Sequence, residues 1–385
     1  MQLSEVRHHS ETRPASPKVI SDLLAGSTIT INGDHPWDIQ VYDDRVYQLI
    51  LTQGSLGFGH AYMEGLWDSD QLDETFHRLL RHDIDQRVDG LVRLRLMLQV
   101  LRHRLFNLQS PGRAFEVAQR HYDLGNDLFE AMLDSRMIYS CAYWDKASTL
   151  EEAQEHKLDL ICRKLELRPG ERLLDIGCGW GGLARFAAER YGVQVVGITI
   201  SKEQQKLAQE RCQGLPVTIE LMDYRGLTGC FDKIVSVGMF EHVGLKNYPA
   251  YFDSAKRLLK DDGLFLLHTI GIHTTCQKTD DWIDNYIFPN GKLPSARELA
   301  TVLEDRFILE DWHNFGPDYD RTLMAWWDNF ERAWPTLEPK YGQVFYRMWK
   351  YYLMCCAGFF RSHQGQLWQI VLSKREHAGT YRSVR

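Results

Sequence analysis

The chain has 385 residues, of which 44% are hydrophobic and 25% are charged. This length predicts one large and one small domain, and this composition is typical of a globular protein with a sizeable core. The formal net charge of −7 disfavours nucleic acid as a partner.

The two ends of the chain and its cysteines indicate a cellular compartment. The polar stretch MQLSEVRHHSETRPASPK at the start contains no signal peptide, and none of the eight cysteines forms a C-x-x-C pair. Both observations favour a reducing, cytosolic compartment with free thiols. The apolar run YYLMCCAGFF (351–360) is too short to span a bilayer. We therefore expect a cytoplasmic protein, which is still able to contact a membrane surface.

The first part of the chain, residues 1–106, is expected to form the small domain from short, mixed elements. Residues 27–43 alternate in polarity around an Asn-Gly-Asp turn and predict a small hairpin. Residues 72–106 are helical in composition. Over residues 87–120, seven arginines stand against two acids, a basic stretch that predicts a solvated face or a subunit contact, with anionic headgroups as the alternative ligand. Residues 107–120 are expected to be a linker to a catalytic domain at 121–385.

From about residue 160 onward, short apolar strands alternate with helical segments. Strands are expected over 172–176, 193–200, 217–222, 231–238 and 263–271, and helices over 182–192, 201–214 (with Ser201 as N-cap) and 247–260. This order predicts an α/β fold with a doubly wound parallel sheet, in which ligands bind at the carboxyl ends of the strands. Asp175, Glu241 and His268 are expected at such strand ends.

The stretch LLDIGCGWGG (173–182) is the strongest motif. Its glycines permit a tight turn and bring backbone N–H groups close to a ligand at a helix N-terminus. Gly177, Gly179 and Gly182 also satisfy the dinucleotide pattern G-x-G-x-x-G, so the glycines alone leave two cofactor classes open. Asp175, directly before them, suits a positively charged ligand, and no acid closes the second strand as a dinucleotide site requires. The motif therefore favours S-adenosylmethionine, which carries an ammonium and a sulfonium.

The ends of the next two strands depart from the usual methyltransferase pattern. Many such enzymes place an acid after the second strand for the ribose hydroxyls, whereas this chain offers Thr199, Ser201 and Gln204. Asp223 and Tyr224, after the third strand, are predicted to face the adenine, with the ring of Tyr224 packed against it. An ordinary turn residue is the alternative for Asp223.

Beyond these motifs, the sequence resembles the bacterial cyclopropane fatty acid synthases along nearly its whole length. The matching stretches are QGSLGFGHAYMEGLWD (53–68), HYDLGNDLF (121–129), YSCAYW (139–144), LDIGCGWGG (174–182), GITISKEQ (197–204), SVGMFEHVG (236–244), LLHTIG (266–271), YIFPNGKLPS (286–295) and DWHNFGPDYDRTLMAWW (311–327). The match in the small domain distinguishes the chain from the shorter mycolic acid cyclopropane synthases, which are similar over the catalytic part only.

The resemblance implies a fold, a reaction and partners. The fold is that of a class I S-adenosylmethionine-dependent methyltransferase, a Rossmann-like doubly wound sheet, with a smaller mixed α/β N-terminal domain. The reaction adds a methylene unit to the cis double bond of an unsaturated phospholipid acyl chain, through methyl transfer, a carbocation and loss of a proton to bound bicarbonate. The chain is implied to lie peripherally on the inner face of the cell membrane and to form a homodimer. A methyl-branched product or another apolar substrate is the alternative.

The resemblance also assigns residues. Glu241, His268 and Tyr319 are implied to hold the bicarbonate with their side chains, and Cys141 and Ile270 to act through backbone groups. His242 is not among these residues and is expected to pack or to support the side chains that hold the ligands. Together with Asp175 and Cys178 of the glycine motif, the expected cofactor residues are Tyr122, Tyr139, Ser140, Gly177, Gly179, Thr199, Gln204, Asp223 and Tyr224.

Three rival interpretations fit the sequence less well. A metal site built from Cys141, Glu241, His242 and His268 is disfavoured, because these residues lack the local spacing of metal ligands. A methyltransferase acting on a small soluble amine or phenol fits poorly with the oily residues after the fifth strand. A lipid-binding protein with an inert catalytic part has no physical need for its acids and histidine at strand ends.

Overall fold

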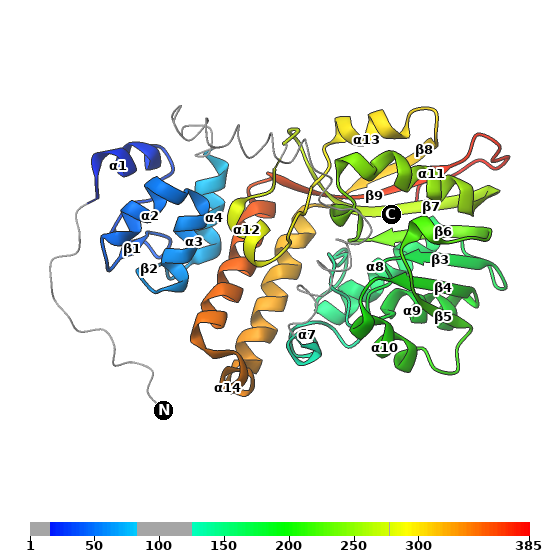
Figure 1. Ribbon diagram of the computed structural model, residues 1–385, viewed down its shortest axis with the longest axis horizontal. Coiled ribbons are helices and arrows are strands. Elements are labelled where there is room, and N and C mark those ends of the chain that lie inside the picture. Colours follow the sequence, from blue (N-terminus) through cyan, green and yellow to red (C-terminus); the bar gives the residue numbers. More distant parts are fainter. Residues whose placement is uncertain (1–15, 83–124, 277) are drawn as a thin grey trace.

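The computed structural model describes residues 16–82, 125–276 and 278–385, and Figure 1 shows how they are arranged. The basic stretch 87–120, the linker predicted at 107–120 and Tyr122 lie outside these ranges, as does the predicted boundary between the two domains. What the sequence predicts for them stays a prediction.

Short helices and two very short strands make up the described N-terminal part. They are α1 (Lys18–Leu24), β1 (Gln40–Val41), α2 (Arg45–Gln53), α3 (Ser55–Met63), β2 (Trp67–Asp68) and α4 (Leu72–Arg81). The helical composition predicted from residue 72 onward is confirmed for α4.

The hairpin predicted over residues 27–43 is wrong. β1 pairs antiparallel with β2, and inside the predicted stretch Ile31 and Ile39 form a parallel bridge. The buried carboxylate of Asp38 explains the difference, because it accepts hydrogen bonds from the backbone N–H groups of Thr30 at 2.7 Å and His35 at 2.9 Å. A side chain that bonds nearby backbone closes a loop and competes with a strand ladder.

A broken helix connects this part to the rest. α14 (Pro317–Arg361) is interrupted at Gly342, whose φ of 73° and ψ of 167° are not helical, and its two arms lie side by side in Figure 1. The guanidinium of Arg361, the last residue of α14, bonds Asp320 near the start of the same helix at 2.9 Å, and Asp73 of α4 at 2.7 Å. The N-terminal elements and α14 share one hydrophobic core cluster. None of the helices in the described ranges is both long and apolar enough to cross a membrane.

Seven strands form one sheet in the order β5-β4-β3-β6-β7-β9-β8. The strands are β3 (Arg172–Ile176), β4 (Gln194–Thr199), β5 (Val217–Leu221), β6 (Phe231–Val237), β7 (Leu259–Ile272), β8 (Ile308–Asn314) and β9 (Gly365–Ser373). The first five in this order are parallel neighbours, which confirms the predicted doubly wound sheet. β9 runs antiparallel between β7 and β8 and was not predicted from the sequence.

Helices cover both faces of the sheet (Figure 1). One apolar cluster joins the sheet to α8 (Leu150–Lys164), α9 (Gly182–Tyr191) and α10 (Lys202–Arg211), and another joins it to α11 (Tyr248–Leu258) and α13 (Ala296–Leu303). The remaining helical elements are α7 (Asn126–Met132), α12 (Asp281–Tyr286), η2 (Tyr224–Gly226), η3 (Phe240–His242) and η4 (Leu245–Asn247). The predicted N-cap is confirmed, since the Ser201 hydroxyl accepts the backbone N–H of Gln204.

The strand positions of the three key polar residues need one correction. Asp175 is the last residue but one of β3, and Glu241 lies in η3 just after β6, as predicted. His268 lies inside β7, which continues to Ile272 because it pairs with β9 along that whole length. His268 is nevertheless level with Val237, the last residue of β6, so it reaches the same edge of the parallel sheet.

Candidate functional site

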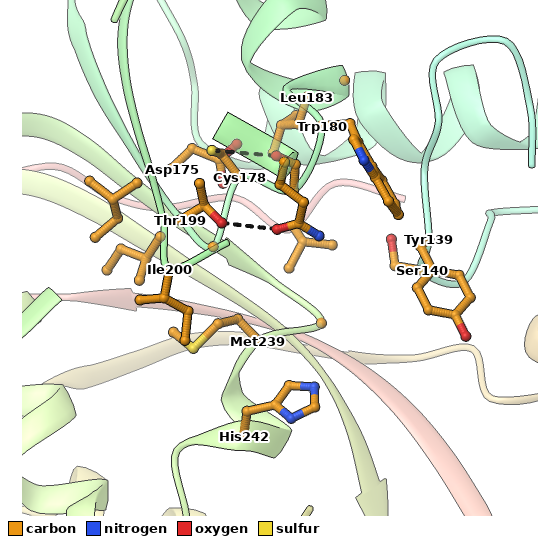
Figure 2. A pocket seen from close by; sticks show the side chains of 18 of the residues that line it. Tyr139, Ser140, Asp175, Cys178, Trp180, Leu183, Thr199, Ile200, Met239 and His242 are labelled. Carbon is orange, nitrogen blue, oxygen red and sulfur yellow. Dashed lines mark hydrogen bonds between the residues drawn. The ribbon is translucent and has the colours of Figure 1, made fainter. Parts of the chain in front are cut away.

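A cavity lies at the carboxyl ends of β3, β4, β5 and β6 (Figure 2). This is the edge at which doubly wound sheets bind their ligands. Apart from Tyr122, every expected cofactor residue lines this one cavity: Tyr139, Ser140, Asp175, Gly177, Cys178, Gly179, Thr199, Gln204, Asp223 and Tyr224.

The glycine turn after β3 has a steric origin. Gly177 has a φ of 83°, and a Cβ added to it would lie 2.7 Å from the side chain of Met239. The backbone N–H groups of Gly177 and Cys178 both donate to the carbonyl of Ile198, at 2.9 and 3.0 Å. These two N–H groups therefore fix the turn to β4 rather than facing a ligand, and the glycine is needed for close packing.

Asp175 is the acid that this turn presents to the cavity. Its side chain is buried, and within the described residues its Oδ2 atom has no hydrogen-bond partner. Burial raises the pKa of Asp175 to about 7, and the positive charge of Lys157 partly opposes this rise. An unpartnered carboxylate oxygen in a low-dielectric cavity fits a ligand that supplies a cationic group.

The wall beyond β4 carries hydroxyl and amide groups in place of an acid. The Thr199 hydroxyl donates to Oε1 of Gln204 at 2.9 Å, and the backbone N–H of Ser201 donates to the Thr199 hydroxyl at 3.2 Å. Thr199 and Gln204 are both buried at the cavity wall. A neutral, hydrogen-bonded pair thus occupies the place where many methyltransferases have a carboxylate.

Asp223 has a partner that sequence reasoning missed. The guanidinium of Arg225 donates to both of its carboxylate oxygens, at 2.7 and 2.6 Å, and Arg225 also lines the cavity. The ring of Tyr224 packs edge-to-face on Tyr251, with centroids 5.3 Å apart. This contact holds the ring as part of the wall. A side chain only two positions after Asp223, and of opposite charge, was a signal in the sequence.

Next to the cavity, the five residues expected to serve the reaction form a second cluster. Oε1 of Glu241 accepts the backbone N–H of Ile270 at 2.7 Å, and Ile270 packs with Cys141 and Tyr319 in one small apolar group. The ring of His268 lies against Phe315 of the same group, with centroids 5.9 Å apart. The structure therefore brings these residues together, and it shows that the Ile270 amide is bonded to Glu241.

Two polar atoms of this cluster are left without partners. Oε2 of Glu241 and Nε2 of His268 are both buried, and neither has a hydrogen-bond partner in the described part of the chain. Burial raises the pKa of Glu241 and lowers the pKa of His268 well below its usual value. The amide of Gln369 donates to Nδ1 of His268 at 3.3 Å, which leaves the ring proton on Nε2. An unused acceptor and an unused donor are what a small hydrogen-bonding anion requires.

Aromatic rings surround the apolar side of this cluster. Tyr319 stacks on Phe360 with centroids 4.5 Å apart, and it meets Trp326 edge-on at 6.0 Å. Tyr139 packs on the same indole at 5.2 Å, and its hydroxyl bonds that of Tyr352 at 2.8 Å. These rings offer π faces to an apolar or cationic group.

The expectation that His242 packs or supports the ligand-holding side chains stays a prediction. His242 lines the cofactor cavity, as Figure 2 shows, while its neighbour Glu241 bonds Ile270 in the adjacent cluster. Both residues lie in η3, and successive side chains of a 3₁₀ turn point about 120° apart. Burial lowers the pKa of His242 to about 4, so its ring is neutral at ordinary pH. Trp180 and Lys157 also line the cavity and were not singled out beforehand.

No set of three or more metal-ligating side chains occurs in the described ranges of the chain. The rival metal site also fails on placement. The thiol of Cys141 is directed to the Ala142 carbonyl at 3.2 Å, and His242 lines the cofactor cavity.

Comparisons with known proteins show which family the chain belongs to. The sequence model of the family described as Mycolic acid cyclopropane synthetase matches residues 109–370. The chain belongs to this family. It is 54% identical over 357 residues to the cyclopropane-fatty-acyl-phospholipid synthase of Escherichia coli strain K12, and the match covers 93% of both chains. The resemblance inferred from the sequence is thereby confirmed.

Solved structures of this cyclopropane synthetase family share the fold. The cyclopropane synthase MmaA2 from Mycobacterium tuberculosis is 35% identical, with a TM-score of 0.64, over 68% of this chain and 98% of the other. The mycolic acid cyclopropane synthase CmaA1, complexed with SAH and CTAB, is 35% identical, with a TM-score of 0.63 and the same coverage. The expected class I methyltransferase fold is confirmed. These shorter relatives match about two thirds of the chain, whereas the E. coli relative matches nearly all of it.

In this protein, Cys141→Ser is expected to retain at least about a tenth of the activity. This corresponds to an increase of less than ~1.4 kcal/mol in the activation barrier. The thiol is fully buried, and burial raises its pKa well above the usual value, so it is a poor nucleophile. A serine hydroxyl can still donate to the Ala142 carbonyl. Steady-state kinetics of the variant, with its melting temperature as the folding control, make the test. Complete loss of activity in a folded variant would assign the thiol a chemical role.

Proposed function

We propose that this chain transfers a methylene unit from S-adenosylmethionine to the cis double bond of an unsaturated phospholipid acyl chain and so forms a cyclopropane ring. One observation carries the proposal: a cofactor cavity beside β3 directly adjoins the Glu241–Ile270–His268 cluster beside β6 and β7. The name of the E. coli relative and its similarity along nearly the whole chain support the same substrate class.

S-adenosylmethionine fits the cavity that the glycine turn builds. Asp175 offers a cationic group a carboxylate oxygen that no side chain in the described ranges bonds, and Thr199 and Gln204 offer neutral polar atoms. Tyr224 supplies an aromatic wall beside Asp223. In this proposal these residues hold the cofactor so that its sulfonium methyl faces the aromatic cluster of Tyr139 and Tyr319. Fixing the two reactants in line contributes a large part of the rate, because an alkene is a weak nucleophile.

The protein's further task is to protect a cationic centre and to direct the loss of a proton. Rings such as Tyr319 and Trp326 stabilise positive charge through their faces, and a buried apolar surround excludes the water that would quench it. Loss of a proton from the transferred methyl then closes the ring.

A bicarbonate ion fits the Glu241–His268 cluster and would supply the base. Among the described residues nothing bonds Glu241 Oε2, which can accept its hydroxyl, or His268 Nε2, which can donate to one of its oxygens. The Glu241 carboxylate and the bicarbonate ion are both anions, so they can lie side by side only if a proton is shared between them. The Ile270 amide orients Glu241, and Gln369 orients His268. We propose that Tyr319 completes this set with its hydroxyl.

We propose that the protein works at the surface of a membrane and does not cross it. Its substrate lives in a bilayer, and the residues 87–120 with their surplus of basic side chains are proposed to contact anionic headgroups. We further propose that residues 1–106 form a separate small domain through which two copies associate.

Product analysis tests the proposed function. Purified protein is incubated with methyl-labelled S-adenosylmethionine and vesicles of unsaturated phospholipid, with saturated phospholipid as the control. We expect label in the acyl chains of the unsaturated lipid alone, with a gain of one CH₂ unit and the ring protons of a cyclopropane by NMR. A methyl-branched alkene has the same mass but retains vinyl protons, and would support the alternative product. Label confined to water-soluble acceptors would refute lipid as the substrate.

A further inference from the structure

Lys157 is a charged cavity residue that has no role in this scheme. Lys157 lies in the middle of α8, its side chain is fully buried, and it lines the cofactor cavity. A buried ammonium is costly to desolvate unless it is paired or hydrogen-bonded, so a lysine at this place requires a physical reason.

The contacts of Lys157 point toward the cofactor site. Its ammonium donates to the hydroxyl of Ser140 at 2.8 Å, and Ser140 lines the same cavity. Within the described residues Lys157 forms no ion pair, although an ammonium has three protons to donate. The side chain thus bonds one neutral cavity group, and no direct contact compensates its charge. Burial lowers the pKa of Lys157 to about 8, so the side chain carries this charge below that pH.

Two carboxylates are close enough to interact with this charge, and they differ in their other partners. Asp134 precedes the cavity loop and accepts the backbone N–H groups of Arg136 and Ile138, both at 2.9 Å. Asp175 is buried with an oxygen that no described group bonds. The charge of Lys157 is therefore most needed by Asp175, which has no hydrogen bond to stabilise that oxygen.

The other titratable groups around Asp175 do not supply charge. They are the thiols of Cys162, Cys178 and Cys212, which lie on α8, on the glycine turn and at the end of α10. Burial raises the pKa of all three, so they stay neutral. His268 also senses the charge of Lys157 and is itself neutral, because burial lowers its pKa. Among the described residues, Lys157 is the charged neighbour of Asp175.

We propose that Lys157 is a positioning residue of the cofactor site: its ammonium holds the Ser140 hydroxyl and keeps the Asp175 carboxylate ionised for a cationic ligand. This inference rests on the proposed use of S-adenosylmethionine. A buried carboxylic acid without a nearby positive charge takes up a proton more readily and then no longer attracts a cation. Lys157 does not touch the cofactor in this account and acts through Ser140 and Asp175.

Cofactor affinity measured against pH tests the proposal without relying on turnover. S-adenosylmethionine is titrated into wild type, Lys157→Met, Lys157→Gln and Lys157→Arg by calorimetry, from about pH 6 to about pH 9. Affinity should fall as the pH is lowered through the protonation of Asp175. In the Met and Gln variants the midpoint of this fall should rise by about one pH unit or more, since a nearby opposite charge shifts a carboxyl by 1–3 units. Lys157→Arg should keep the wild-type midpoint if it folds.

Matched controls separate this role from a general effect of losing a buried lysine. Lys233 of β6 is also buried but does not line the cavity, so Lys233→Met should leave the midpoint unchanged. Ser140→Ala should weaken binding at every pH without moving the midpoint. Adding Asp175→Asn to Lys157→Met should abolish the pH dependence, because the two changes then act on one titration. Melting temperatures verify the fold of each variant.

The outcomes distinguish this inference from the function on which it rests. Equal midpoints in wild type and both neutral variants, with measurable binding in each, would overturn the role of Lys157. Absence of S-adenosylmethionine binding by wild type at every pH would instead refute the proposed cofactor. If the Met variant does not fold, the Gln variant, which can still bond Ser140, carries the test.

Discussion

Removal of dissolved carbon dioxide from the buffer is expected to abolish most of the wild-type activity, and added bicarbonate is expected to restore it. Glu241→Ala should lower kcat by about 10²-fold or more at ambient bicarbonate, the scale of a positioned proton acceptor. The alanine variant should respond to bicarbonate only at much higher concentration, because both the acceptor Oε2 and the link to the Ile270 amide are lost.

Glu241→Gln should retain more activity than Glu241→Ala, and the structure indicates why. A glutamine oxygen can take over the hydrogen bond from the Ile270 N–H group, which leaves its NH₂ group where Oε2 of Glu241 now lies. That group can donate to an anion, although it cannot accept the hydroxyl of bicarbonate. The glutamine variant should therefore bind the ion with reduced affinity, while the alanine variant has no polar group at this position and leaves the ion to His268 and Tyr319.

A bicarbonate titration of wild type, Glu241→Gln and Glu241→Ala in stripped buffer makes the measurement. If Glu241 were itself the base, the glutamine variant should be as damaged as the alanine variant, and bicarbonate should change neither. Full activity of wild type in stripped buffer, with a flat response in all three proteins, contradicts a bound-bicarbonate base. His268 and Tyr319 variants should show non-additive losses with Glu241→Gln, because all three residues would serve one ion.

The parts of this site that follow one another along the chain could be predicted from the sequence. Local sequence patterns determine the glycine turn after β3, the N-cap at Ser201 and the parallel strands. The apolar residues of a strand and the residues of a turn are neighbours in the sequence, so a short stretch is enough to predict them. β9 could not be placed in this way. It follows α14 in the chain, and the residues of Gly365–Ser373 do not indicate that this strand pairs with β7 and β8.

Contacts across elements account for the functional residues that were missed. Lysine is rarely found fully buried, so a lysine on a helix is read as a solvated residue, and only the fold shows that Lys157 faces Ser140. His242 is expected to pack or to support neighbouring side chains, and only the fold shows that it lines the cofactor cavity while Glu241 bonds the Ile270 amide. Asp38 overturned the predicted hairpin through side-chain bonds that strand periodicity does not include.

Asp175→Asn is expected to weaken S-adenosylmethionine binding by roughly 10- to 100-fold, the equivalent of about 1.5–3 kcal/mol for a hydrogen bond to a charged group. The substitution keeps the shape of the side chain and removes the charge that the cationic ligand needs. The affinity of wild type should fall as the pH is lowered through about 7, where Asp175 takes up a proton. The affinity of the asparagine variant should not show this fall, because an amide does not titrate in this range.

The stability of the same variant separates a lost ligand contact from a damaged fold. Because burial raises the pKa of Asp175 in the folded protein, the folded state binds this proton more tightly than the unfolded chain does. This carboxyl therefore lowers the free energy of unfolding as the pH rises from about 4 to about 7, and the penalty is fully present above that range. Asparagine removes the penalty, so Asp175→Asn should melt at the same or a higher temperature than wild type at pH 8 while binding the cofactor less well.

Calorimetry and thermal melts of both proteins at two pH values make the comparison. Unchanged affinity in the variant, or tight binding of a nicotinamide dinucleotide by wild type, would refute the cofactor proposed for this cavity, and a large loss of melting temperature would instead assign Asp175 to the fold.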